Sequence, residues 1–86
     1  MNKINFRQLP VYTSIRKDNT EIMDVSEVLA DTIYKNVGGV VAHSLALRIY
    51  NDGEVELNEK ECEIVRMVAD GFVGIIADSI KDKISS

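Results

Sequence analysis

The segment that begins at Asn58 constrains the fold most, because the sequence marks both its start and its buried face. Asn58 is a favourable N-cap residue, and Glu61 can return a hydrogen bond to it, as in a capping box. At about 100° per residue, the apolar residues that follow form one broad arc of a helical wheel. That arc consists of Ile64, Val65, Val68, Ala69, Phe72, Ile75, Ile76 and Ile80, and the opposite side consists of Glu63, Arg66, Asp70 and Lys81. We therefore expect an amphipathic helix over about 59–83, which Gly71 and Gly74 can bend or break because each costs about 1 kcal/mol relative to alanine.

Another helix is expected over about 26–37. Either Asp24 or Ser26 is its candidate N-cap, and Gly38 and Gly39 end it. Its apolar residues recur at helical spacing, and they are Val28, Leu29, Ile33 and Val37. This spacing predicts that they share the buried face.

A third helix is expected over about 40–50, and only Arg48 is charged within it. A helix with so little polar surface is typically the buried central one. It ends at a turn-forming sequence, which is Asn51, Asp52 and Gly53. The alternating segment Glu54–Leu57 then predicts a single extended strand before Asn58.

The residues before these helices predict a β-hairpin. Strands are expected at 11–16 and 20–25, because both stretches are rich in β-branched, aromatic and other apolar residues, and Pro10 fits just ahead of the first. The turn between them is formed by Lys17, Asp18 and Asn19. With two-residue alternation, the faces expected to lie on the helices carry Val11, Thr13 and Ile15 in the first strand, and Met23 and Val25 in the second.

Length and composition predict one small domain over residues 1–86. A chain of 86 residues has room for one core, and an apolar fraction of 45% is normal for a globular protein. Cys62 is the only cysteine, so neither an intrachain disulfide nor a cysteine-rich metal site is expected. The expected fold class is α+β and helix-dominated, with the N-terminal β-hairpin packed on the three helices. Without a signal-like or membrane-spanning apolar run, the expected location is the cytoplasm.

The stretch 57–72 resembles the opening helix of a LuxR-type helix-turn-helix domain. The matching residues are Leu57, Glu61, Glu63, Ile64, Val65, Val68, Ala69, Asp70, Gly71 and Phe72. The resemblance implies DNA binding through a later basic recognition helix in the major groove. This chain has only Lys81 and Lys83 in its last dozen residues, beside Asp78 and Asp82, and so it departs from the family where DNA would be read.

The stretch from Tyr50 to Glu59 resembles the loop of an EF-hand calcium site. With Gly53 at the sixth loop position, Asp52 and Glu59 fall at acceptable ligand positions. The first and third positions then fall on Arg48 and Tyr50, which cannot supply the oxygens that calcium requires. An ordinary acidic turn is therefore expected, and no metal is predicted.

The candidates for catalysis are His43, Ser44 and Cys62. His43 is the only imidazole, and the sequence pairs it with neither possible nucleophile. The acidic neighbours of Cys62 also disfavour a reactive thiolate. No catalytic residue, cofactor or small-molecule ligand is predicted, and the expectation is that the chain is not an enzyme.

The charge balance favours protein partners. With 14 acidic and 10 basic residues, the net charge of -4 opposes attraction to nucleic acid or to an anionic membrane. Two apolar-rich helices in so short a chain suggest a protein-interaction or self-association module with a protein partner or a homodimer. Met67 and Val73, which lie off the main apolar arc, are the candidate exposed contacts. The alternative is a transcription-related accessory protein that uses the segment 57–72.

Overall fold

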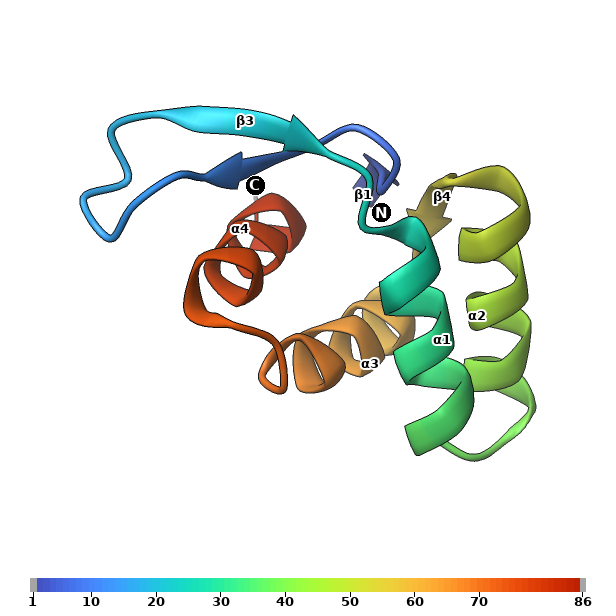
Figure 1. The fold of residues 1–86 in the computed structure, drawn as a ribbon. Helices are drawn as coiled ribbons and strands as arrows, with labels where there is room; N and C mark the ends of the chain where they lie inside the picture. The colour runs from blue at the N-terminus through green and yellow to red at the C-terminus, as the bar shows by residue number, and fades with distance from the viewer. Residues whose placement is uncertain (1, 86) are drawn as a thin grey trace.

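The chain forms four helices and four short strands over residues 2–85, the part that the computed structural model describes (Figure 1). In chain order these are β1 (Asn2–Asn5), β2 (Leu9–Tyr12), β3 (Thr20–Met23), α1 (Ser26–Asn36), α2 (Val40–Asp52), β4 (Glu54–Leu57), α3 (Glu59–Ala69) and α4 (Gly74–Ser85). The predicted helix-dominated α+β class is confirmed.

The helix expected over 59–83 is divided into α3 and α4, so the prediction of one helix is wrong and the prediction of a break near the glycines is confirmed. The N–H groups of Gly71 and Phe72 each donate over 3.0 Å to a carbonyl three residues earlier, which tightens the chain and ends α3. At the start of α3 the predicted capping box is present. The Glu61 N–H donates to Asn58 Oδ1 over 2.9 Å, and the Asn58 N–H donates to Glu61 Oε1 over 3.0 Å.

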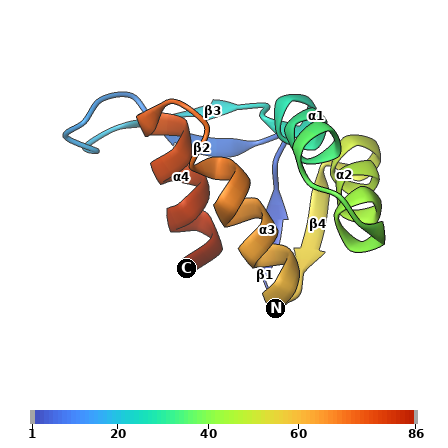
Figure 2. The same cartoon turned by 90° about the horizontal axis from the view of Figure 1, so that it is seen from below.

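β4 is paired, and its partner is the N-terminal strand β1, for which no strand was predicted. The two strands are antiparallel, and Ile4 lies opposite Val55 with both side chains buried. Just beyond this pair, the Phe6 N–H donates to the carbonyl of Gly53 over 2.9 Å. Figure 2 shows β1 and β4 side by side between α2 and α3, so this small sheet joins the N-terminal segment to the segment that connects α2 with α3.

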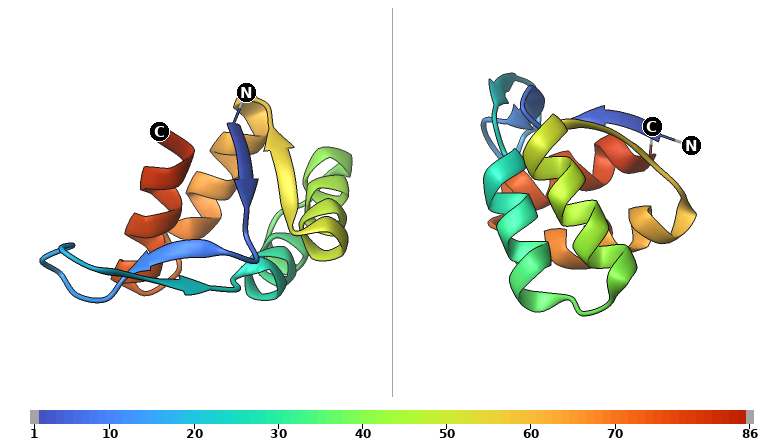
Figure 3. Two further views of the ribbon diagram at one scale, coloured as in Figure 1. Left: turned by 90° about the horizontal axis from the view of Figure 1, so that it is seen from above. Right: turned by 90° about the vertical axis from the view of Figure 1, so that its right-hand side faces the viewer.

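The predicted hairpin is β2 paired antiparallel with β3. Val11 and Val25 are buried as predicted, but Thr13, Ile15 and Met23 are not. Leu9 and Val11 are the buried pair, whereas Ile15 is 91% exposed and Met23 is also exposed. The reason is that β2 begins two residues earlier than predicted and ends at Tyr12, so Ile15 lies in the wide turn. The hairpin projects past α4 and gives the molecule its long dimension of 38 Å against 21 Å in the other two directions (Figure 3).

The bounds predicted for the first two helices are confirmed to within two residues, but the burial predicted for α2 is wrong. Only one face of α2 is buried, and Val40, Leu47 and Tyr50 are exposed. Val28 on α1 is exposed as well. Instead of lying in the centre, α2 packs on α1 at one side of the fold (Figure 1).

Every helix and strand except β3 contributes to a single core. Its largest fully buried side chains are Phe6, Ile4, Leu9, Leu29, Ile33, Leu45, Ile49, Leu57, Ile80, Val11, Val25 and Val65. The exposed apolar side chains therefore lie on surfaces outside this core, and they locate the candidate functional sites.

Candidate interaction site

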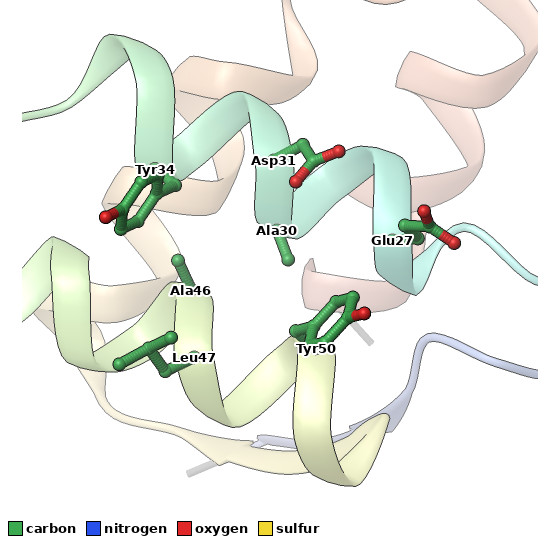
Figure 4. A pocket seen from close by; sticks show the side chains of 7 residues that line it. All are labelled: Glu27, Ala30, Asp31, Tyr34, Ala46, Leu47 and Tyr50. Carbon is green, nitrogen blue, oxygen red and sulfur yellow. The ribbon is translucent and has the colours of Figure 1, made fainter.

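A groove runs between α1 and α2, and alanines form its floor. Ala30 on α1 and Ala46 on α2 are both buried and face each other across the helix contact (Figure 4). Such small side chains allow two helices to approach closely, so the larger side chains beside them stand up as walls. The volume of this open groove is about 270 Å³.

Two tyrosines stand at opposite ends of this groove, one from each helix (Figure 4). The exposed fractions are 56% for Tyr34, 45% for Leu47 and 54% for Tyr50. Tyr34 also packs against His43, with ring centroids 5.0 Å apart. Exposed aromatic side chains such as these tyrosines are typical anchor residues of protein interfaces, because an aromatic ring gives a large contact area for few rotatable bonds.

The α1 side of the groove is acidic. Glu27 and Asp31 lie one helical turn apart on α1, and none of the seven lining residues is basic. The lining therefore combines apolar rings with carboxylates. This combination suits a side chain that has both an apolar stem and a positive charge, such as lysine or arginine.

Two polar contacts fix the end of the groove where Tyr50 lies. Arg7, in the turn between β1 and β2, donates through Nη2 to the carbonyls of Tyr50 and Asn51 over 3.1 and 2.9 Å. These carbonyls belong to the last turn of α2, where a cation is favourable. At the start of α1, Asp24 Oδ1 accepts from the Ser26 hydroxyl over 2.7 Å and from its N–H over 3.0 Å. These hydrogen bonds from Ser26 lower the pKa of Asp24.

The three catalytic candidates from the sequence do not come together in one site. His43 and Ser44 are exposed on α2, whereas Cys62 is buried on α3. Within residues 2–85, no hydrogen bond joins His43 to either possible nucleophile, and its ring instead packs on Tyr34. The histidine is thus a surface residue at the edge of the groove.

The segment that resembles a calcium loop is divided between two elements, because Asp52 ends α2 and Glu54 begins β4. Gly53 between them has a φ of 73° and lies against the side chain of Arg7. In the part of the chain that the structure describes, no three acidic, histidine or cysteine side chains gather in a way that could hold a metal ion. The same residues include no helix with the length and apolar character of a bilayer crossing.

The hairpin is attached to α4 by a second set of polar contacts. The Tyr12 N–H donates to Ser79 Oγ over 2.9 Å, and the Tyr12 hydroxyl donates to Asp82 Oδ2 over 2.5 Å. Lys17 forms an ion pair with Asp78 over 3.3 Å. The acidic residues of α4 therefore bind the hairpin rather than facing solvent alone.

We predict that this attachment weakens in alkaline solution. The hydrogen bond to Asp82, together with burial and the charges of Asp82 and Asp78, raises the pKa of Tyr12 above its ordinary value of 10.0. The folded protein thus holds the phenol proton that the unfolded chain loses, so this contribution is complete below pH 10.0 and disappears as pH rises through the raised pKa. Urea unfolding of the native protein and of Tyr12→Phe, from about pH 9 to about pH 11, measures it. The difference between the two proteins should shrink with pH, and a constant difference would contradict the assignment.

Both predicted surface contacts are exposed. Met67 lies on the outer side of α3, and Val73 lies in the turn before α4. Val73 joins Ile15 and Ile75 around a hollow of about 430 Å³ below the turn of the hairpin. The groove residues Leu47 and Tyr50 were not predicted, because the segment 40–50 was interpreted as the buried central helix, and Tyr34 on α1 was not singled out either. A signal was present, since Ala42 and Ala46 already mark one narrow face of that helix.

Comparison with protein-family models, with curated proteins and with solved structures found no significant match for this chain. Its function must therefore be inferred from its own surfaces.

Proposed function

We propose that this chain is a non-enzymatic protein-interaction module whose α1–α2 groove binds a segment of a partner protein. The segment carries an apolar side chain next to lysine or arginine. One observation supports this above all: Tyr34, Leu47 and Tyr50 stand exposed around a buried alanine floor, beside two carboxylates. Scattered apolar residues are normal on a protein surface, whereas a contiguous apolar groove with a charged rim is typical of a binding site.

The chemistry of the groove defines what it can hold. An apolar side chain would cover Ala30 and Ala46 and remove the two tyrosine rings from water. A cation beside it would meet Glu27 or Asp31 and a ring face, a contact that contributes about 0.5 to 1 kcal/mol at an exposed site. Phosphate groups would meet these carboxylates unfavourably, and the net charge of -4 acts in the same direction. A protein segment is therefore a better occupant than nucleic acid.

Peptide binding followed by NMR tests this proposal. The probe is a helical peptide of leucine and lysine, and its control replaces every lysine with glutamate. We expect the lysine peptide to shift the signals of Tyr34, Leu47 and Tyr50, and the glutamate peptide to leave them unchanged. Tyr50→Ala should weaken the lysine peptide about tenfold, because anchor residues carry most of the energy of an interface. Met67→Ala, an equally exposed apolar residue on α3, is the matched control and should bind like the native protein.

Three results would contradict the proposal. The first is equal binding of the glutamate peptide, and the second is full binding by Tyr50→Ala. The third is a dimer in light scattering that Tyr50→Ala converts to a monomer, which would assign the groove to self-association. In that case the occupant is a second copy of this chain.

The transcription-related alternative has one feature in its favour, because α3 and α4 are two helices joined by a short turn at 70–73. However, α4 is attached to the hairpin through Ser79 and Asp82, and its charged residues are two aspartates and two lysines, so the helix has no net positive charge. DNA recognition requires cations on the inserted element. We therefore rank this function below the interaction module.

A further inference from the structure

β3 has one paired edge and one free edge. In an antiparallel pair, only alternate residues of each strand bond across to the other strand. The Thr13 N–H donates to the Asn19 carbonyl over 3.1 Å, so Glu21, two residues further along, also bonds to β2. The N–H and C=O groups of Thr20 and Ile22 must then point away from β2.

Two features of β2 support this alternation independently. Pro10 lies opposite Ile22 and has no N–H to donate, which is tolerated only at a position that does not bond across the pair. Tyr12 lies opposite Thr20, and its N–H is directed to Ser79 on α4. The outer edge of β2 is therefore covered by α4 and proline, and among residues 2–85 no helix or strand covers the outer edge of β3 in the same way.

The free edge is accessible along its length. All four residues of β3 are exposed, Ile22 to 63%, and among the helices and strands β3 packs only on β2 to any extent. Protein edge strands are commonly protected by proline, lysine or a bulge. The sequence of β3 contains neither proline nor lysine, and its register with β2 is continuous.

The charges around this edge select the partner. Asp18, Glu21 and Asp24 lie along β3 and at its ends, whereas Arg16 is in the turn and Lys17 is paired with Asp78. A second copy would bring the same carboxylates together, which is unfavourable for directly opposed strands. We propose that the free edge of β3 binds an extended, basic segment of a partner protein as an added strand.

The side chains of β3 define the pattern of that segment. Thr20 and Ile22 point to one face of the hairpin, and Glu21 and Met23 point to the other. A partner strand with alternating apolar and basic residues would place the apolar ones beside Ile22 and the basic ones beside Glu21. No residue of β3 lines the α1–α2 groove.

The test uses an acetylated and amidated peptide of alternating lysine and valine, with a glutamate and valine peptide as its control. We expect the lysine peptide to shift the amide signals of Thr20 and Ile22 and to slow their hydrogen exchange. The Glu21 amide, already bonded to β2, should change little in exchange. Raising salt from about 50 to about 200 mM should weaken binding, because the charges on this edge are exposed.

Ile22→Pro removes one outward N–H, and it leaves the bonds between β2 and β3 because Ile22, opposite Pro10, does not bond across the pair. It should weaken the lysine peptide about tenfold, whereas Ile22→Val keeps the N–H and should bind like the native protein. A lysine and valine peptide N-methylated at every residue tests the same bonds on the native protein, and it should not bind. Tyr50→Ala in the groove should have no effect.

The proposal is overturned if the glutamate peptide or the N-methylated peptide binds equally well. It is also overturned if the lysine peptide shifts only the groove residues. A dimer in light scattering that Ile22→Pro makes monomeric would assign the edge to a second copy and would equally refute a basic partner.

Discussion

Replacing Phe6 with alanine should destabilise the protein by about 3 to 5 kcal/mol, the range measured for fully buried phenylalanines. Phe6 has no exposed surface and lies in the turn between β1 and β2. Its N–H donates to Gly53, and its carbonyl accepts from Val25 over 2.8 Å. Alanine keeps these backbone bonds, so the loss measures the cavity left by the ring. A small domain has only about 5 to 15 kcal/mol in total, so much of the stability depends on this side chain.

Urea unfolding followed by circular dichroism measures this loss. The matched control is Phe72→Ala, because Phe72 is the other phenylalanine of the chain and is only partly buried in the turn between α3 and α4. It should cost clearly less than Phe6→Ala, since truncating a partly exposed ring leaves no closed cavity. If Phe72→Ala lowered the free energy of unfolding more than Phe6→Ala, the assignment of Phe6 as a fully buried core residue would be contradicted.

Replacing Glu61 with alanine should cost about 2 to 3 kcal/mol. The Glu61 side chain is 8% exposed, caps α3 through the Asn58 N–H and forms an ion pair with Arg48 on α2. Removing one member of a buried ion pair leaves its partner without a hydrogen bond, and this usually costs more than about 2 to 3 kcal/mol. The expected loss of stability is smaller here because the Arg48 side chain is 40% exposed, so water can solvate it once Glu61 is removed.

The matched control is Glu63→Ala on the same helix, which is exposed and should change stability by less than about 0.5 kcal/mol. A double-mutant cycle with Arg48→Ala isolates the ion pair from the capping contact. If Glu61→Ala were as mild as Glu63→Ala, the bond between α2 and the start of α3 would not contribute to folding. Arg48→Ala should cost less than Glu61→Ala, because Glu61 keeps its bond to Asn58.

The proposed sites differ in how far the sequence indicated them. The net charge of -4 and two apolar-rich helices were visible in the sequence, and they favoured a protein partner. The groove was missed because apolar residues in α2 were assigned to the core, although Leu47 and Tyr50 lie on its outer side. Composition shows how apolar a helix is, but not which of its faces meets another element.

The local features of this protein could be predicted from its amino-acid sequence alone. The capping box of Asn58 and Glu61, the break near Gly71 and the helix-dominated α+β class all depend on residues close together in the chain. Short-range hydrogen bonds and backbone preferences are sufficient for such features.

The sequence did not predict the pairing of β1 with β4, the exposed face of α2 or the free edge of β3, which became visible only in the three-dimensional fold. Each depends on contacts between distant segments, such as Ile4 with Val55 or Tyr12 with Ser79. Periodicity identifies the side chains that share a face, but the packing of all elements around one core decides which face is covered. The surfaces proposed for partners are those that this packing left open.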